Sequence, residues 1–312
     1  MRDRVFCIIV LYNAMQWIKK CLDSLLVSEL PVSIVCIDNC SVDDTCKLIE
    51  NDYPSVTLIK NEKNKGFGQA NNQGIEYAYK NGATHFFLLN QDAWVFPTTI
   101  KELLKTQKEY SLGLVSPIHL NGDASLVDHN FFDALIINPK NNIMFRDVLL
   151  RDPKPYYTPK YTPCAAAWLL SKQCIETVGG FDPLFFHYGE DANLFQRALY
   201  HNVGVGVITN AFICHDREYH GNVVVYNKRR TLTQLLIKYA DVNSNQTKKQ
   251  EIKKIHLFFL KSFILLISRF EFSKASQIIG GYIQFFKKQH IIKKSIQTNR
   301  LVGPSWLKLS DC

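Results

Sequence analysis

The chain has 312 residues, of which 46% are hydrophobic and 12% are aromatic. That is enough to bury a large core, and it is too apolar for a disordered chain. No apolar run reaches the roughly 18 residues that a membrane-spanning helix needs, and no small-residue cleavage site follows the first apolar segment, so we expect no secretory signal. The net charge of +9 is concentrated in residues 247–312, which hold thirteen Lys and Arg against three acids. Such a tail suits an anionic partner, either a membrane or a nucleic acid.

The nine cysteines are scattered and include no Cys-x-x-Cys pair. We therefore expect them to be small buried hydrophobic residues rather than metal ligands or disulfide partners. This usage predicts a reducing compartment.

Strand-like and helix-like segments alternate through the first hundred residues. The expected strands are 5–11, 32–37, 56–60 and 85–89, and the expected helices are 14–26, 43–51 and 68–81. This alternation predicts an α/β fold with a mainly parallel central sheet.

The later segments are less regular. Five prolines lie in residues 121–163, which we expect to be irregular and to cover the site as a lid. We expect a strand at 165–170, a turn at 179–182, a helix at 191–201, a strand at 203–208 and only helices after about residue 225.

Polar residues follow each of the first four strands. They are Tyr12-Asn13, Asp38-Asn39, residues 61–68 and Asn90-Gln91-Asp92. Ligands of such sheets bind beyond the carboxyl ends of the strands. The sequence therefore predicts a binding site at this edge.

Two nucleotide-binding alternatives are excluded by the loops. The turn after the first strand, Tyr12-Asn13-Ala14-Met15, has no Gly-x-Gly-x-x-Gly, and no phosphate-binding lysine loop is present. A divalent cation is the other way to hold phosphates, and Asp92 could bind Mg²⁺ or Mn²⁺. The plainer alternative is an exposed loop aspartate.

Two further stretches could carry chemistry. In "FFHYGEDANLFQRA", Glu190-Asp191 opens a helix, where one acid would suffice as a cap and the second could be a general base. In "FICHDRE", His215 ends a strand-like run and is either structural or a partner of Asp92.

Several ordered motifs in residues 5–220 resemble the family 2 glycosyltransferases of GT-A fold, especially the bacterial rhamnosyltransferase-like subgroup. "IVLYN" resembles the opening strand and nucleotide-binding turn, "IDNCSVDDT" the segment that places Asp38 on the base, and "NEKNKGFGQANNQGI" a third family segment. "LLNQDA" resembles the metal-binding DXD motif, with Asn90 in place of its first acid. "GGFDPLFFHYGEDANLFQRA" resembles the acceptor-side segment, with Asn193 in place of its last acid.

The resemblance implies a role for each matching residue. The implied nucleotide and donor residues are Tyr12, Asn13, Asp38, Asn39, Asn64, Gly66, Asn72, Asn90 and Gln91. Asp92 and His215 are the implied ligands of Mg²⁺ or Mn²⁺. Asp191 is the implied catalytic base, and Glu190 tunes it or holds the acceptor.

The implied activity is an inverting, metal-dependent transfer of sugar from a UDP- or dTDP-sugar, with dTDP-rhamnose as a candidate, to a lipid-linked surface polysaccharide. Two alternatives remain. One is a non-catalytic protein of the same fold that binds sugar nucleotides or acts as a scaffold, which Asn90 and Asn193 in place of acids favour. The other is a sugar-1-phosphate nucleotidyltransferase, against which the absence of a Gly-rich first loop argues.

The chain divides into a GT-A domain, residues 1–225, and a basic amphipathic helical region, residues 226–312. Two expected helices, at 253–270 and 273–288, either pack on the domain or bind anionic lipid. Nucleic acid is not expected as a partner, because no recognised motif is present. The cysteine usage, the lack of a membrane-spanning run and the basic amphipathic tail together predict a cytoplasmic protein, peripheral on the inner face of the plasma membrane.

Overall fold

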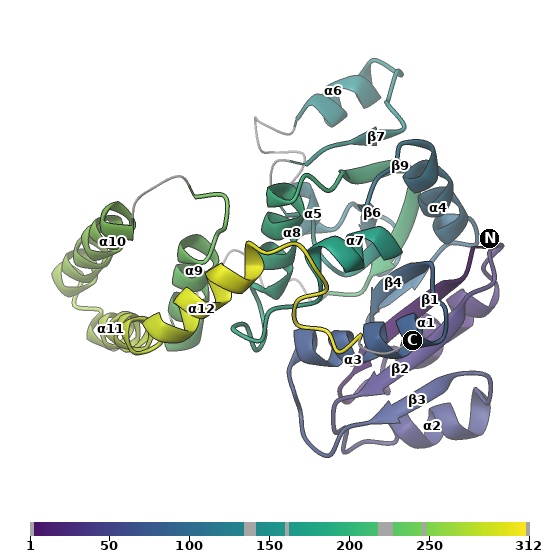
Figure 1. The fold of residues 1–312 in the computed structure, drawn as a ribbon, viewed down its shortest axis with the longest axis horizontal. Helices are drawn as coiled ribbons and strands as arrows, with labels where there is room; N and C mark the ends of the chain where they lie inside the picture. Colours follow the sequence, from purple (N-terminus) through teal and green to yellow (C-terminus); the bar gives the residue numbers. More distant parts are fainter. Residues whose placement is uncertain (1–2, 134–141, 160–161, 218–226, 245–247, 310–312) are drawn as a thin grey trace.

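The computed structural model describes residues 3–133, 142–159, 162–217, 227–244 and 248–309. Its strands form one nine-stranded sheet in the order β3-β2-β1-β4-β8-β6-β9-β5, with β7 also paired to β9, and helices cover both faces (Figure 1). The strands are β1 (Val5–Leu11), β2 (Ser33–Asp38), β3 (Thr57–Lys60), β4 (His85–Asn90), β5 (Ala93–Val95), β6 (Leu114–Asn121), β7 (Tyr156–Tyr157), β8 (Ala167–Ser171) and β9 (Val205–His215). The helices are α1 (Ile18–Leu26), α2 (Thr45–Asp52), α3 (Phe67–Lys80), α4 (Thr99–Glu109), α5 (His129–Phe132), α6 (Ile143–Leu149), α7 (Lys172–Val178), α8 (Glu190–Tyr200), α9 (Lys228–Tyr239), α10 (Lys248–Ser268), α11 (Phe272–Lys287) and α12 (Gln289–Asn299).

The predicted parallel arrangement holds for one half of the sheet. Strands β3, β2, β1 and β4 are parallel neighbours, so their carboxyl ends meet at one edge. Beyond β4 the sheet is mixed, because β8 runs antiparallel to both β4 and β6, while β9 is parallel to β6 and antiparallel to β5 and β7. The GT-A-type α/β architecture is therefore present, and "mainly parallel" describes its N-terminal half.

The core lies on both faces of the sheet, as the continuous apolar runs predict. In β1, Cys7 and Ile9 pack on one face with residues of α1 and α4, whereas Phe6 and Ile8 pack on the other with residues of α3, α7 and α8. Successive side chains of a strand point to opposite faces, so every side chain of a strand covered on both faces is buried and is expected to be apolar.

The middle of the chain is more ordered than the sequence predicted. Helix α4 and strands β5 and β6 had no predicted counterpart, and residues 121–163 contain α5, α6 and β7. Parts of the expected lid, 134–141 and 160–161, lie outside the described residues.

The C-terminal helices build a separate core. Leu235, Tyr239, Phe285 and Ile292 from α9, α11 and α12 pack around Phe185 of the first domain. Helix α10 contributes Ile255 to this core and packs Leu266 against α11. The predicted division of the chain after residue 225 lies within 218–226, outside the described residues.

The last described segment, 300–309, returns to the first domain beside α7 and α3 (Figure 1). Leu307 and Leu309 join the core on the α3 face. The amide of Gly180 donates to the carbonyl of Ser305 at 2.8 Å. This segment and α12 tie the helical region to the sheet.

Candidate active site

The turn after β4 carries the first group of candidate residues. Asn90 ends the strand, and its side-chain oxygen Oδ1 is buried without a hydrogen-bond partner. Gln91 is occupied by the neighbouring loop: its Oε1 accepts from the Tyr12 amide at 2.7 Å, and its Nε2 donates to the Tyr12 carbonyl at 3.2 Å. Gln91 therefore links the ends of β1 and β4, and Asn90 and Asp92 are left to face the site.

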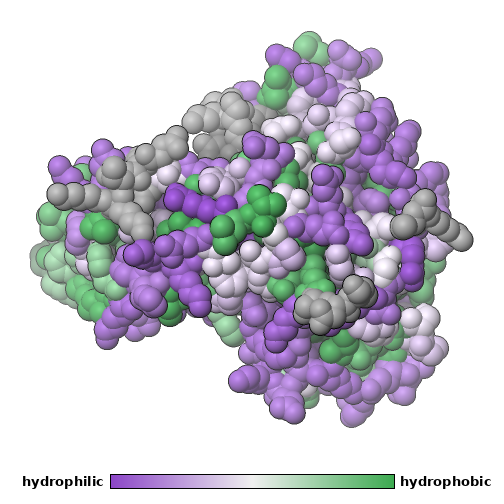
Figure 2. All heavy atoms as spheres, viewed as in Figure 1, coloured by the Kyte–Doolittle hydropathy of each residue, from purple (hydrophilic) through white to green (hydrophobic). Residues whose placement is uncertain are grey.

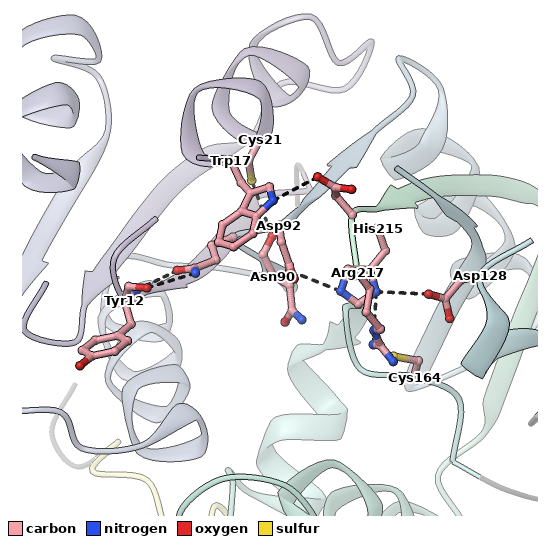
Figure 3. Close-up of polar contacts among 11 residues, drawn as sticks. Tyr12, Trp17, Cys21, Asn90, Asp92, Asp128, Cys164, His215 and Arg217 are labelled. Atoms are coloured by element: carbon pink, nitrogen blue, oxygen red, sulfur yellow. Dashed lines mark hydrogen bonds and ion pairs between the residues drawn. The ribbon is translucent and has the colours of Figure 1, made fainter. Parts of the chain in front are cut away.

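Strand pairing brings His215 to Asp92. Strand β5 is antiparallel to β9, and Ala93 pairs with His215 in this register. His215 Nε2 lies 3.3 Å from Asp92 Oδ1, and the His215 side chain is only 2% exposed against 25% for Asp92 (Figure 3). The Asp92 carbonyl also accepts from the Asp216 amide at 2.8 Å, which holds the turn in place. Residues 123 positions apart in the sequence thus form one pair.

The charge state of His215 follows from this contact. Burial lowers the pKa of His215, but the Asp92 carboxylate and the Cys164 thiol outweigh it and raise the pKa to about 9. The pocket beside Asp92 therefore favours a positive charge. A divalent cation would satisfy the same preference in place of the proton.

Asp92, His215 and Asn90 fit a divalent metal ion. A carboxylate oxygen, an imidazole nitrogen and the orphaned Oδ1 of Asn90 supply ligand types that Mn²⁺ and Mg²⁺ accept. An amide oxygen is a weaker ligand than a carboxylate, but it still fills a coordination position. The buried unpartnered oxygen is the observation that makes Asn90 a fit for the first DXD position.

Three residues that the sequence interpretation missed lie behind His215. Its Nδ1 is 3.9 Å from Asp128 Oδ2 and 3.3 Å from Arg217 Nη2, and the same Nη2 is 3.0 Å from the sulfur of Cys164 (Figure 3). Arg217 is two positions after His215 in the quoted "FICHDRE", so only that adjacency could have indicated it. Asp128 and Cys164 have no comparable sequence signal.

The acidic pair at the start of α8 forms the other side of the site. Glu190 is 5% exposed, and its Oε2 is buried without a partner. Burial and the neighbouring charge of Asp191 raise the pKa of Glu190 to about 8. Asp191 is less buried than Glu190, and burial raises the pKa of its carboxyl too.

Arg217 connects the two acidic groups electrostatically. Its positive charge lowers the pKa of Asp191, while Asp92 is among the charges that raise the pKa of Arg217. Both carboxylates therefore lie within the field of one guanidinium. The charge of Arg217 therefore acts on Asp191 of the acid pair and on Asp92 of the metal-type pair.

The donor-side loops are shaped by their own side chains. Asp38 is buried and accepts from the amides of Cys40 and Ser41, at 3.2 and 3.1 Å. Asn39 accepts from the Lys65 amide at 3.0 Å and donates to Asn64 Oδ1 at 3.1 Å. These contacts fix the loops after β2 and β3.

Two more donor-side residues have structural contacts. Asn13 has a φ of 49°, and its Oδ1 accepts from the Val42 amide at 2.9 Å. Gly66 has a φ of 84°, and a Cβ there would lie 2.2 Å from the carbonyl oxygen of Phe186. Only glycine fits this contact between the donor loop and the segment before Glu190.

Asn72 is not brought to this group. It is 3% exposed, its Nδ2 donates to the carbonyls of Phe181 and Trp306 at 2.8 and 3.2 Å, and its Oδ1 accepts from the Phe181 amide at 2.7 Å. Both the oxygen and the nitrogen of the Asn72 side chain therefore have partners inside the fold. Its motif position indicated a donor contact, but tertiary packing gives it a structural one.

Asn193 is likewise directed away from the site. It is fully buried, and its Oδ1 accepts from the guanidinium Nε of Arg197 at 3.1 Å. Arg197 in turn donates to the carbonyl of Val178 at 2.7 Å. The loss of an acid at position 193 therefore affects internal packing in this structure.

Comparisons with known proteins bear on the family of this chain. Residues 6–153 match the family model described as glycosyl transferase family 2. Residues 6–153 therefore carry a family 2 glycosyltransferase domain. The resemblance seen in the motifs, and the enzyme class it implied, are confirmed.

Relatives of this glycosyltransferase include two rhamnosyltransferases. It is 24% identical over 217 residues to the dTDP-rhamnosyl transferase RfbF of Shigella flexneri, which covers 69% of this chain and 70% of RfbF. It is 26% identical over 217 residues to the N-acetylglucosaminyl-diphospho-decaprenol L-rhamnosyltransferase of Mycobacterium tuberculosis. This match covers 63% of this chain and 71% of that protein. The mannosyltransferase PcManGT of Pyrobaculum calidifontis, solved with GDP-Man and Mn²⁺, has a TM-score of 0.58 at 13% identity over 93% of this chain and 88% of its own. That last similarity supports the fold.

Proposed function

We propose that this glycosyltransferase is metal-dependent and inverting, and that it transfers a sugar from a UDP- or dTDP-sugar to a hydroxyl of a growing surface polysaccharide. The observation that carries the proposal is the Asp92–His215 contact at 3.3 Å, with the orphaned Oδ1 of Asn90 on the same turn. This donor set matches a cation that also binds phosphate oxygens.

A divalent cation bound by Asp92, His215 and Asn90 would neutralise the charge that develops on the leaving diphosphate. Arg217, which lies against His215 and acts electrostatically on Asp92, adds a second positive charge there. Asp38 and the loops after β1 and β2 receive the nucleoside.

Asp191 is the proposed base. It takes the proton of the acceptor hydroxyl, whose oxygen bonds to the anomeric carbon while the bond from that carbon to the diphosphate breaks. One in-line displacement inverts the configuration. Burial raises the pKa of Asp191, which makes its carboxylate a stronger base than an ordinary aspartate.

Glu190 is less suited to be the base and better suited to hold the acceptor. With a pKa of about 8, its carboxyl is mostly protonated at neutral pH. A protonated carboxyl with a free oxygen can donate to, or accept from, a sugar hydroxyl. It also leaves Asp191 as the charged member of the pair.

The rhamnose donor and the lipid-linked acceptor are proposed from the relatives. One is named as a dTDP-rhamnosyl transferase, and the other by a diphospho-decaprenol acceptor. The combination suits a glycan assembled on a lipid at a membrane surface.

We infer that α10 provides the membrane contact of this peripheral, cytoplasmic enzyme. Its exposed residues include Leu257, Phe258, Ile264 and Leu265, each 48–57% exposed. Exposed Lys254 and Lys261 lie on the same stripe, at helical spacing from these residues. Figure 2 shows hydrophobic residues at the surface of the lobe that contains α10 and α11. Among the described residues no helix is long and apolar enough to cross a bilayer, so a contact through α10 would lie in the plane of the surface.

The donor site is tested by calorimetric titration with UDP and with dTDP, each with and without Mn²⁺. We expect Mn²⁺-dependent binding that is lost in Asp92→Ala and kept in Asp52→Ala, a control at the exposed end of α2. The preferred nucleotide identifies the base of the donor. Absence of binding under every condition would favour the non-catalytic alternative in its scaffold form, which does not need to bind a nucleotide.

The membrane contact is tested by sedimentation with vesicles. We expect binding to vesicles containing phosphatidylglycerol, and a reduction of at least tenfold in the double variant Leu257→Glu/Ile264→Glu. Leu126→Glu, at a 68% exposed apolar residue outside the helical region, is the control. Equal binding by all three proteins would rule out α10 as the contact.

A further inference from the structure

A second group of metal-ligand side chains is centred on His215, and the proposed transfer uses only His215 of its three members. His119, Cys164 and His215 each offer one ligand atom, and these atoms all lie within 4.8 Å of one another. His119 is fully buried, and its Nδ1 has no hydrogen-bond partner. A buried imidazole with an unpartnered nitrogen costs free energy unless something binds there.

The fold brings the three residues together from separate strands. Strands β6 and β9 are parallel neighbours, so His119 and His215 sit on adjacent strands, and their ring centroids are 6.3 Å apart. Phe131 stacks on His119 with ring centroids 4.8 Å apart, which fixes that imidazole. Cys164 approaches from the segment before β8.

We propose that His119, Cys164 and His215 form a binding site for a thiophilic divalent cation such as Zn²⁺. One thiolate and two imidazoles are a ligand set that Zn²⁺ binds in a tetrahedral arrangement, with the fourth position left to water or to Asp128. Mg²⁺ and Mn²⁺ prefer oxygen ligands and have little affinity for the sulfur. The two sites therefore differ in the metals they select.

The two sites share His215, and this makes them mutually exclusive. Its Nε2 faces Asp92, whereas its Nδ1 lies on the side of Arg217 and Asp128, where Arg217 also contacts Cys164. A neutral imidazole has one nitrogen lone pair, and its other nitrogen carries a proton. His215 can therefore serve only one cation at a time.

Arg217 competes for the same space. Its Nη2 is 3.0 Å from the Cys164 sulfur, so a cation bound there must displace it. The Arg217 side chain is exposed and can move into solvent. On binding, the Cys164 thiol and His215 each release any proton they hold to solvent, and Zn²⁺ takes the freed lone pairs.

The consequence is inhibition by Zn²⁺ that Mn²⁺ relieves. Only this consequence depends on the proposed transfer reaction, since the cation site itself can be measured without turnover. Absence of Zn²⁺ binding to the unsubstituted chain would overturn the proposal of a cation site at His119, Cys164 and His215. Zn²⁺ binding without competition by Mn²⁺ would overturn the shared use of His215.

The site is tested by titrating the reduced full chain with Co²⁺ alone and recording thiolate-to-cobalt charge-transfer absorption. We expect one such Co²⁺ per chain, complete loss of the band in Cys164→Ser, and an unchanged band in Cys46→Ser, which removes another half-buried thiol. A band that persists in Cys164→Ser, or no band in the unsubstituted chain, would overturn the proposal.

Two further variants sharpen the test. We expect His119→Gln to weaken Co²⁺ binding at least tenfold, and Arg217→Gln to tighten it because the competing guanidinium is gone. Mn²⁺ with UDP should weaken Co²⁺ binding in the unsubstituted chain. Unchanged affinity in His119→Gln would show that Cys164 binds cobalt without this site, and weaker binding in Arg217→Gln would contradict the competition.

Discussion

The two sides of the active-site edge differ in how their polar side chains are used. On the donor side, Asp38, Asn39 and Asn64 bind backbone amides or one another and shape the loops. Around the metal pair and α8, Asn90 Oδ1 and Glu190 Oε2 are buried without partners. The polar atoms of the first group have hydrogen-bond partners, so their burial costs little free energy. Those of the second group have none, so their burial destabilises the folded protein when no ligand is bound.

This difference separates residues that give the site its form from residues available for chemistry. A side-chain amide whose hydrogen-bonding groups all have partners contributes by holding its loop in place. Its removal should therefore lower the free energy of unfolding more than it lowers activity. An unsatisfied oxygen contributes to folding little or unfavourably, so its removal should lower activity and leave stability equal or higher. Three variants test the distinction, beginning with the one expected to change activity most.

Asp191→Asn should have the largest effect. We expect transfer to fall by about 10²–10⁴-fold, the usual contribution of a general base, while affinity for UDP or dTDP with Mn²⁺ is kept. Sugar transfer and nucleotide titration on the same preparation measure the two quantities. Asp52→Asn is the control, and ordinary turnover in Asp191→Asn would rule out Asp191 as the base.

Asn72→Ala should lower stability by about 2–4 kcal/mol, because it leaves the buried Phe181 amide and carbonyl and the Trp306 carbonyl without their partner. Denaturant unfolding measures this loss. The variant that remains folded should bind nucleotide with unchanged affinity.

The control for that variant is Asn81→Ala, at an exposed residue that follows α3 and whose side chain donates only to the Tyr77 carbonyl. A variant Asn72→Ala that keeps its stability but loses nucleotide affinity would return Asn72 to the donor site.

Glu190→Gln should have little effect on stability below about pH 4.5, and its effect should grow as the pH rises. Because burial and Asp191 raise the pKa of Glu190 from 4.5 to about 8 in the folded protein, the folded state holds this proton more tightly than the unfolded chain. The free energy of unfolding of the unsubstituted chain therefore falls between about pH 4.5 and 8, and this fall is smaller in the variant.

Thermal unfolding across that range measures the effect. We expect Glu190→Gln to have the higher Tm at pH 8 and no advantage below pH 4.5, with Glu109→Gln on the exposed end of α4 as the control. A Tm difference that is constant with pH would mean that Glu190 is ionised in the folded protein.

Most of the parallel half of the fold could be predicted from the sequence. Strand β1 is found at the predicted residues, and the other early elements differ by a few residues at their ends. The prediction succeeded because a strand covered on both faces has a continuous apolar sequence between polar loops. It failed for β5, which has only three residues, and for β6, whose apolar run is interrupted by Ser116 and Pro117. It also omitted α4, although Ile100, Leu103 and Leu104 follow helical spacing there.

The candidate site was predictable in its residues but not in its contacts. Asp92, Asp191 and His215 were indicated by their places at strand ends or a helix start as well as by the family motifs. Motif position alone indicated Asn72, whose side chain donates to the Trp306 carbonyl inside the fold. A motif records which residue stands at a position and carries no information about which of its atoms remain free.

Local patterns are enough to predict an α/β sheet of the nucleotide-sugar type with polar residues at one edge, because strand and helix periodicity and loop chemistry are local properties. Long-range packing sets three other features: β9 runs beside β5 and brings His215 to Asp92, Cys164 and His119 lie close to His215, and α10 leaves some of its apolar residues exposed. These are pairings between residues far apart in the chain. They depend on the register of strands and the packing of helices, which no local pattern encodes.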